Sequence, residues 1–212
     1  MIESTPLPSD PKAGNQHWVV VTEPSLEPIS VDEVKTFGRI DGSSEDTLLG
    51  GFITAVRKAA EDYLGRSLVT RPMKLYLDYW PGMEVELPRP PLYSITKVAT
   101  RTEAGVETTY SASSYFTVST AIPGKVVIKN GATPPINTDR YTAGYVVEYY
   151  AGYNDPALDP AVDADTIRAT IPAPIREAMK LWVMQVYENR ELSPDPPPEA
   201  KVILSMYRVW NY

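Results

Sequence analysis

The chain has 212 residues, 43% of them hydrophobic, which is enough for one large domain or two small ones with a real core. The formal net charge is −7, and the absence of cysteine excludes disulfides and thiolate metal sites. No segment is strongly basic, so the clustered lysines and arginines of a phosphate-gripping protein are missing. The start lacks the basic and apolar regions of a secretory signal, and the aliphatic runs are too short for a membrane span, so we expect neither.

The N-terminal part of the chain predicts an arm followed by a short helix. Residues 1–28 are rich in proline and lack a clear period, which favours an extended arm with a possible strand at Trp18–Val21. Ser30 and Glu33 then form the S-x-x-E pattern of a capping box. We therefore expect a helix from about residue 31 to 39.

Residues 45–64 predict the long helix around which the chain is organised. Apolar side chains recur there three and four residues apart, which is helical spacing. Ser43 or Ser44 is predicted to cap its start by accepting a bond from a free backbone N–H. Arg57 and Lys58, with Glu61 and Asp62, fit a solvated helix face with pairing between positions i and i+4.

Three glycines of this stretch have different expected roles. Gly65 is predicted to adopt the left-handed conformation that closes the last turn. Gly50 and Gly51 each cost about 1 kcal/mol relative to alanine in a helix interior. They could mark close approach of a neighbouring chain, so we take them as candidate subunit-interface residues.

The period changes to that of strands near residue 70. Short alternating segments separated by Pro-Gly, Ala-Gly and Asn-Gly turns predict a small antiparallel sandwich or barrel. The candidate strands are residues 73–79, 85–87, 94–101, 106–110, 115–119, 125–129 and 141–150.

Tyrosines share one face of the last predicted strand. Tyr141, Tyr145, Tyr149 and Tyr153 recur at intervals of four. One interpretation is packing of the sheet with hydroxyls reaching solvent. The other is an aromatic contact surface for another subunit, with Tyr145 and Tyr149 as its candidate residues.

An acidic, proline-containing loop is expected at residues 154–170. Its acids are Asp155, Asp159, Asp163 and Asp165. A flexible loop with several oxygens is what calcium prefers, but the spacing does not match the calcium-loop pattern. We therefore predict a solvated loop and no metal site.

The C-terminal part predicts a helix, a spacer and an aromatic tail. Pro172 and Pro174 suit the first turn of a second long helix that ends near residue 189. The proline run at 193–198 predicts a stiff spacer, followed by a short segment with helical spacing. The large side chains of residues 207–212 could pack on their own domain or anchor a partner.

These elements predict an α+β fold with a C-terminal extension. The predicted helical bundle core comprises residues 29–70 and 171–192, with an antiparallel β-sandwich or barrel-like domain inserted at 71–153. The remaining parts are the arm at 1–28, the acidic loop at 154–170, and the spacer with a docking segment at 193–212.

The residues offer little support for catalysis. His17 is the only histidine and lies in the arm, and the chain has no cysteine nucleophile. Neither G-x-x-x-x-G-K-[ST] nor G-x-G-x-x-G occurs, so the common phosphate-binding loops are missing. A hydrolase with paired carboxylates stays open as a minor alternative, because 27 acids make such pairs unavoidable by chance. We predict a protein that is not an enzyme and has no cofactor.

Through seven short motifs, the sequence resembles the head–tail connector (adaptor) proteins of tailed bacteriophages and gene transfer agents. They cover most of residues 28–210, and their order and spacing carry the resemblance more than any single motif does. The motifs are ISVDEV at 29–34, EDYLGRSL at 61–68, LPRPPL at 87–92, YYAGY at 149–153, IPAPIREA at 171–178, YENRE at 187–191 and LSMYRV at 204–209.

The resemblance implies a structural virion protein at the head–tail interface, assembled in the host bacterial cytoplasm. It implies a helical core with a β-insert, and a homo-oligomeric ring of about twelve subunits beneath the portal protein. The ring would extend the channel through which DNA passes without sequence-specific binding, and would dock the stopper or tail-completion protein. In related connectors the C-terminal segment inserts into the portal, which points here to Leu204, Tyr207, Arg208 and Trp210. The alternative is a tail-associated module whose β-insert recognises a glycan or host surface.

Overall fold

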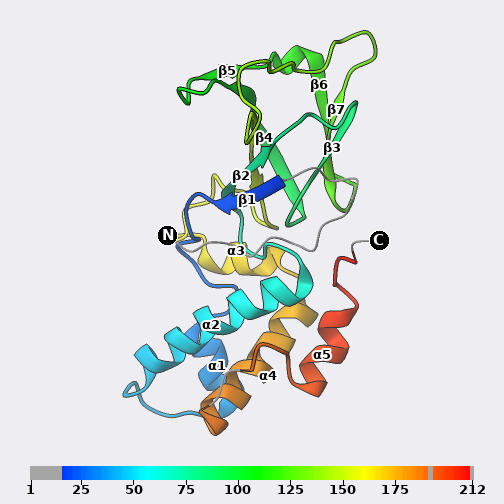
Figure 1. The fold of residues 1–212 in the computed structure, drawn as a ribbon. Coiled ribbons are helices and arrows are strands. Elements are labelled where there is room, and N and C mark those ends of the chain that lie inside the picture. The colour runs from blue at the N-terminus through cyan, green and yellow to red at the C-terminus, as the bar shows by residue number, and fades with distance from the viewer. Residues whose placement is uncertain (1–15, 191–192, 211–212) are drawn as a thin grey trace. The chain divides into compact units, whose positions relative to one another are not determined.

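The computed structural model describes residues 16–190 and 193–210, and predictions for the other residues lie outside it. The chain divides into two compact units, whose elements are labelled in Figure 1. The β unit takes the chain up to residue 23 and residues 70–152, and the helical unit takes residues 24–69 and 153 onward. Helices and two antiparallel sheets together confirm the predicted α+β class.

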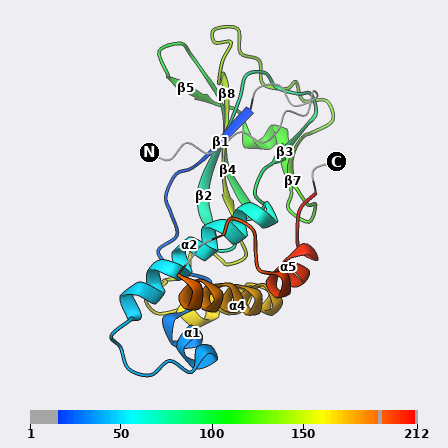
Figure 2. The same cartoon turned by 60° about the horizontal axis from the view of Figure 1, so that its bottom comes forward.

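The helical unit is built from two segments that are far apart in the sequence. α2 packs against α4, and α1 and α5 also pack against α4 (Figure 2). Trp182 of α4 is buried in the same core as Leu49 and Ile53 of α2. Each such apolar side chain contributes about 1.5–3 kcal/mol when it is fully buried. The helices are α1 (Val31–Gly38), α2 (Asp46–Leu64), α3 (Ala164–Thr170), α4 (Ala173–Asn189) and α5 (Pro198–Ser205).

The first helix starts as predicted. Ser30 Oγ accepts a hydrogen bond from the Glu33 N–H at 3.1 Å, and Glu33 Oε2 accepts one from the Ser30 N–H at 2.7 Å. These reciprocal bonds form a capping box and satisfy N–H groups that the helix cannot pair itself. The second Glu33 oxygen accepts a bond from Arg176 of α4, so the cap also joins two helices.

The predicted serine cap of the long helix is wrong. α2 begins after Glu45, which makes no side-chain capping bond. Ser43 contributes only its backbone carbonyl, which accepts the Asp46 N–H at 3.3 Å. The Glu45 carboxylate instead accepts a hydrogen bond from the hydroxyl of Tyr187, which lies near the C-terminal end of α4. The predicted left-handed end is present at Gly65, with φ at 66°.

The acidic stretch at 154–170 is not a loop throughout, because its last seven residues form α3. The Asp163 carbonyl accepts the Ile167 N–H at 2.8 Å, and Ile167 is buried in the helical core. Arg168 pairs with Asp165 one turn earlier at 3.2 Å. The charges suggested a solvated loop, but a short helix can be stabilised by tertiary packing, here by burial of Ile167 and a bond from Arg168 to the Glu27 carbonyl.

The β unit is an open sandwich. One sheet has the order β1-β2-β8-β4-β5 and the other β3-β7-β6, and no barrel closes among the described residues. Of the two predicted alternatives, the sandwich is therefore correct. The strands are β1 (Gln16–Val20), β2 (Arg71–Leu77), β3 (Glu84–Leu87), β4 (Leu92–Arg101), β5 (Glu107–Thr109), β6 (Tyr115–Val118), β7 (Gly124–Ile128) and β8 (Tyr145–Ala151).

Alternating side chains from the two sheets form one apolar core. Met73, Leu75 and Leu77 of β2 point into it, together with Val126 of β7. Gly124 lies where β7 comes close to β4. A Cβ at this position would be 2.4 Å from Leu92 Cβ, so a side chain would force the strands apart.

Candidate functional site

The residues that could carry catalysis have structural partners. The His17 ring stacks on Tyr76 of β2, with the ring centroids 4.8 Å apart. The carboxylates of Asp155 and Asp159 accept backbone N–H groups of their own loop, at 2.9 Å each. Within residues 16–190 and 193–210, no group of three or more histidines and acids could hold a metal ion. No helix in the same ranges is long and apolar enough to cross a membrane.

The C-terminal segment packs on the helical unit. Leu204 of α5 is fully buried in the helical core. Beyond α5, the Val209 N–H donates to the Leu64 carbonyl at the end of α2, with 2.8 Å between nitrogen and oxygen. Arg66 Nε donates to the Tyr207 carbonyl at 2.5 Å. Of the four predicted portal-docking residues, Leu204 therefore serves the core in this conformation.

Three apolar side chains of the same segment are exposed: one in α5, one at its C-cap and one beyond the helix. Val202, Met206 and Trp210 follow one another at intervals of four and have exposed fractions of 63%, 75% and 56%. We call these three residues the apolar stripe. The Arg208 guanidinium lies 4.8 Å from the centre of the Tyr63 ring and 4.5 Å from that of Trp210. These cation–π contacts hold the end of the stripe against α2.

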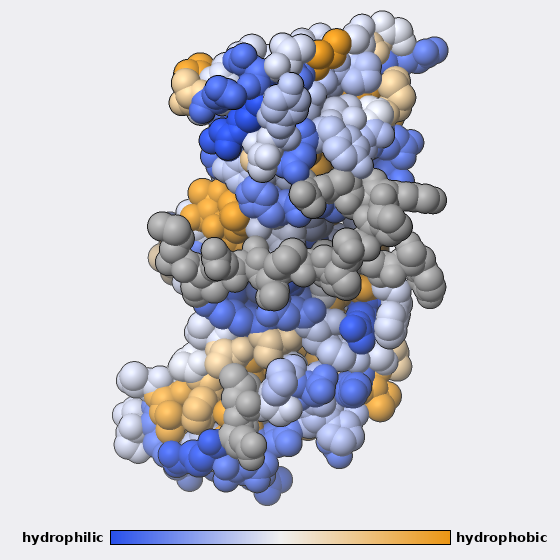
Figure 3. All heavy atoms as spheres, in the orientation of Figure 1, coloured by the Kyte–Doolittle hydropathy of each residue, from blue (hydrophilic) through white to orange (hydrophobic). Residues whose placement is uncertain are grey.

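The stripe is one of several exposed apolar features of the described chain, among which Ile136 and Val162 are similarly exposed. On the face shown in Figure 3, apolar side chains form small separate patches among polar ones. Val202 and Met206 were missing from the predicted docking set. The spacing of four residues between Val202 and Met206, at the end of α5, is the signal that could have included them.

The two interior glycines of α2 have no packing role within the helical unit. A Cβ at either Gly50 or Gly51 would meet no heavy atom within 4 Å. The stability that these glycines cost the helix, relative to alanine, is therefore not offset by a close contact within the described chain. Both stay proposed as subunit-interface residues.

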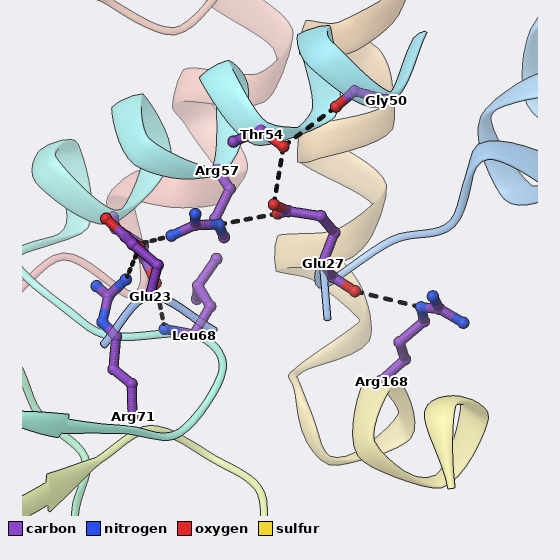
Figure 4. A network of polar contacts seen from close by, with 9 residues as sticks. Glu23, Glu27, Gly50, Thr54, Arg57, Leu68, Arg71 and Arg168 are labelled. Atoms are coloured by element: carbon purple, nitrogen blue, oxygen red, sulfur yellow. Dashed lines mark hydrogen bonds and ion pairs between the residues drawn. The ribbon is translucent and has the colours of Figure 1, made fainter. Parts of the chain in front are cut away.

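A buried polar network joins α2 to the segment before α1 (Figure 4). Arg57 and Glu61 are each only 2% exposed, so the predicted solvated face is wrong for these two residues, although Asp62 is exposed and the i,i+4 pair of Arg57 and Glu61 is present at 3.1 Å. Arg57 Nε also donates to Glu27 at 2.8 Å, and the Thr54 hydroxyl donates to the second Glu27 oxygen. Glu61 Oε1 accepts the Leu68 N–H at 2.9 Å, which fixes the chain just after α2. Buried charges need this number of partners to be tolerated.

The outer face of the five-stranded sheet carries a ladder of ion pairs. Glu148 of β8 pairs with Lys74 of β2 at 2.7 Å and with Lys97 of β4 at 3.5 Å. The hydrogen bond to Glu148 raises the pKa of Lys74, and that to Glu107 raises the pKa of Lys97. Desolvation acts to raise the pKa of Glu148, but the bonds and charges of the two lysines lower it overall. The ladder binds three strands together through charge.

The predicted tyrosine face is divided between core and solvent. Tyr145 and Tyr149 are buried in the core of the β unit, whereas Tyr141 is exposed. The Tyr149 hydroxyl donates to the Pro88 carbonyl at 3.0 Å, and burial raises the pKa of this hydroxyl. The Tyr145 oxygen accepts the Asn137 N–H at 2.9 Å. In this conformation both side chains pack in the core of the β unit.

Comparison with known proteins gives one family and one fold. Residues 28–125 match the family described as "Phage gp6-like head-tail connector protein". No curated protein matches the sequence significantly. A chain from the structure "Neck of empty GTA particle computed with C6 symmetry" has 22% identity and a TM-score of 0.74, covering 92% of this chain and 97% of that one.

Two further structures show the same likeness. A chain of "Virion of native gene transfer agent (GTA) particle" has 22% identity and a TM-score of 0.72, with coverage of 92% and 96%. A chain of "Neck of native GTA particle computed with C12 symmetry" has 20% identity and a TM-score of 0.69, with coverage of 92% and 97%. At these identities the likeness establishes a shared fold over nearly the whole of both chains.

Proposed function

We propose that the chain is a structural protein of the head–tail junction of a phage or gene transfer agent particle, because residues 28–125 match the phage gp6-like head–tail connector family. The observation that carries this proposal is the family match combined with the fold of a neck protein over 92% of the chain. The role is mechanical rather than catalytic: the protein joins other components and leaves a path for DNA.

We propose that the working form is a ring of about twelve copies beneath the portal protein. The neck with C12 symmetry, which contains a chain of this fold, supports that number. A closed ring needs two different surfaces of each subunit to meet. The backbone at the half-buried Gly50 and the exposed Gly51 is a candidate for one of them, because a neighbouring element can approach a helix closely where side chains are missing.

The charge of the helical unit suits contact with a DNA path. It has 17 aspartates and glutamates against 11 lysines and arginines, which accounts for −6 of the total charge of −7. Acidic walls repel phosphates, so a duplex can slide past them without binding. The proposed ring thus extends the channel of the portal and docks a stopper or tail-completion protein on its other side.

The apolar stripe is the proposed contact with the portal protein. Trp210 is the expected anchor, because tryptophan is the residue type most enriched among interface hot spots. Arg208 and Tyr207 position it against α2. Met206 adds an exposed, flexible apolar side chain that can adapt to its partner surface.

A substitution in the stripe tests this contact. Met206→Glu should weaken binding to the purified cognate portal protein at least tenfold, because binding would then desolvate a carboxylate in an apolar contact. Ser205→Glu is the control, since it adds the same charge at the adjacent exposed position of the same helix end. Equal binding by the two variants, measured by biolayer interferometry, would overturn the assignment of the stripe. Absence of portal binding by the unmodified protein would overturn the connector function itself.

A further inference from the structure

The three-stranded sheet of the β unit is open at both of its edges. β7 lies in the centre and pairs on one side with β3 and on the other with β6. No strand among the described residues pairs with the outer side of β3 or of β6. An open strand edge presents unpaired backbone N–H and C=O groups to any chain that can pair with them.

The hydrogen bonds to β7 show which backbone groups point outward. Ile128 N–H donates to the Met83 carbonyl, so the alternation of an antiparallel pair turns the backbone groups of Glu84 and Glu86 away from β7. On the other side, Lys129 N–H donates to the Ser114 carbonyl. By the same alternation, β6 turns the backbone groups of Tyr115 and Thr117 outward.

The two edges differ in charge. β3 has the exposed carboxylates of Glu84 and Glu86, which pair with Lys125 of β7 at 3.2 and 3.1 Å. β6 has the sequence YFTV, without any charge, and its Phe116 is exposed. Two β3 edges would bring four glutamates together and repel each other, as like charges on paired strands do. A β3 edge placed against a β6 edge avoids that repulsion.

The geometry suits head-to-tail repetition. β3 and β6 each have four residues and both run antiparallel to β7, so they run parallel to each other. Rotation about a ring axis can therefore place β3 of one copy beside β6 of the next in parallel register. With about 4.8 Å per strand, about twelve such sheets would give a circumference of roughly 170 Å and a diameter of about 55 Å. Such a ring is wide enough for a DNA duplex.

We propose that β6 of each copy pairs with β3 of the next, so that the three-stranded sheets join into one continuous β-ring. The partner of each edge is a second copy of this chain. This inference rests on the ring of the proposed function and adds the surface through which the ring closes. The outward backbone groups of Thr117 and Glu86 become hydrogen-bonded only in the assembled state.

Cysteine crosslinking tests the pairing directly, because the chain has no cysteine of its own. The tested pair combines Phe116→Cys on β6 with Glu86→Cys on β3. Within one copy these strands are separated by β7, about 9.6 Å apart, which exceeds the Cα separation that a disulfide spans. A second pair with Glu84→Cys covers a shift of two residues in register.

The expected result is a ladder of disulfide-linked oligomers after oxidation of assembled protein. The control combines Glu86→Cys with Lys125→Cys, which are direct neighbours within one sheet and should give only a crosslinked monomer. If microscopy shows rings and the control crosslinks, but neither tested pair gives oligomers, the β-ring is overturned and the connector function stands. If the unmodified protein forms no ring with the portal protein, the function and the inference both fail.

A proline substitution provides a second test. Thr117→Pro removes an outward N–H that has no partner within the sheet, and proline is tolerated at such edge positions. The variant should unfold at a similar urea concentration to the unmodified protein but fail to form rings. Thr117→Val keeps the N–H and should do both normally. Rings of normal abundance with Thr117→Pro would overturn the inference.

Discussion

The buried network of α2 predicts a large effect from a single carboxylate. Replacing Glu61 by leucine removes the acceptor of Arg57 Nη1 and of the Leu68 N–H. Breaking a buried ion pair by removing one partner costs about 3–5 kcal/mol, and an unsatisfied buried N–H costs about 1–3 kcal/mol. Arg57 keeps Glu27, at 2.8 Å, so the two effects should not add fully. We expect Glu61→Leu to lower the free energy of unfolding by about 4 kcal/mol.

Urea unfolding followed by helical circular dichroism measures this loss. Glu61→Gln keeps an oxygen for the Leu68 N–H, so its loss should be about half as large. The control is Glu177→Leu, which removes the partner of Lys180 in an exposed pair and should cost less than about 1 kcal/mol. A loss below about 1 kcal/mol for Glu61→Leu would refute the idea that this pair holds the helical unit together.

Four other substitutions, at three positions, test separate parts of the structure. Gly50→Ala should raise the free energy of unfolding by about 0.5–1 kcal/mol, because the new methyl group meets open space; Gly50→Leu should leave folding intact yet reduce ring assembly seen by microscopy, and equal damage to both would return this position to a purely structural role. Tyr149→Phe should cost about 1–2 kcal/mol in urea unfolding because the Pro88 carbonyl loses its donor, and an unchanged midpoint would show that the bond contributes nothing. Because the pKa of Glu148 is lowered in the folded state, its stabilisation is present above the ordinary value of 4.5 and is lost as the pH falls through the folded value; Glu148→Gln should flatten this acid-side loss in melting temperature, and an unchanged pH profile would exclude the pair with Lys74 as its source.

Periodicity was sufficient to predict the main elements of the fold. The capping box of α1, the left-handed end at Gly65 and the short strands after residue 70 depend on local patterns, and the structure has all of them. The class of fold followed from their order, because helical segments flank a run of short strands.

Burial could not be predicted where a side chain depends on distant partners. Arg57 and Glu61 have the spacing of a solvated ion pair, and only Glu27 and the turn at Leu68 make their burial possible. Similarly, the spacing of Tyr145 and Tyr149 fits both a contact surface and a packed sheet, and only the structure shows that both side chains are buried in the core of the β unit. Tertiary contacts, rather than local pattern, decide between such alternatives.

The candidate surfaces show the same limit. Leu204 was predicted to dock on a portal, but its side chain is buried in the core of the helical unit. The exposure of Val202, Met206 and Trp210 depends on how α5 and the residues after it pack on the helical unit. The structure was therefore needed to choose which side chains of this segment to propose as a contact surface.

The most direct test of the central claim is electron microscopy of the purified chain mixed with its cognate portal protein. We predict a ring of about twelve copies seated on one end of the portal, with a central opening. Portal particles that lack any added ring at saturating concentration of the chain would contradict the connector function.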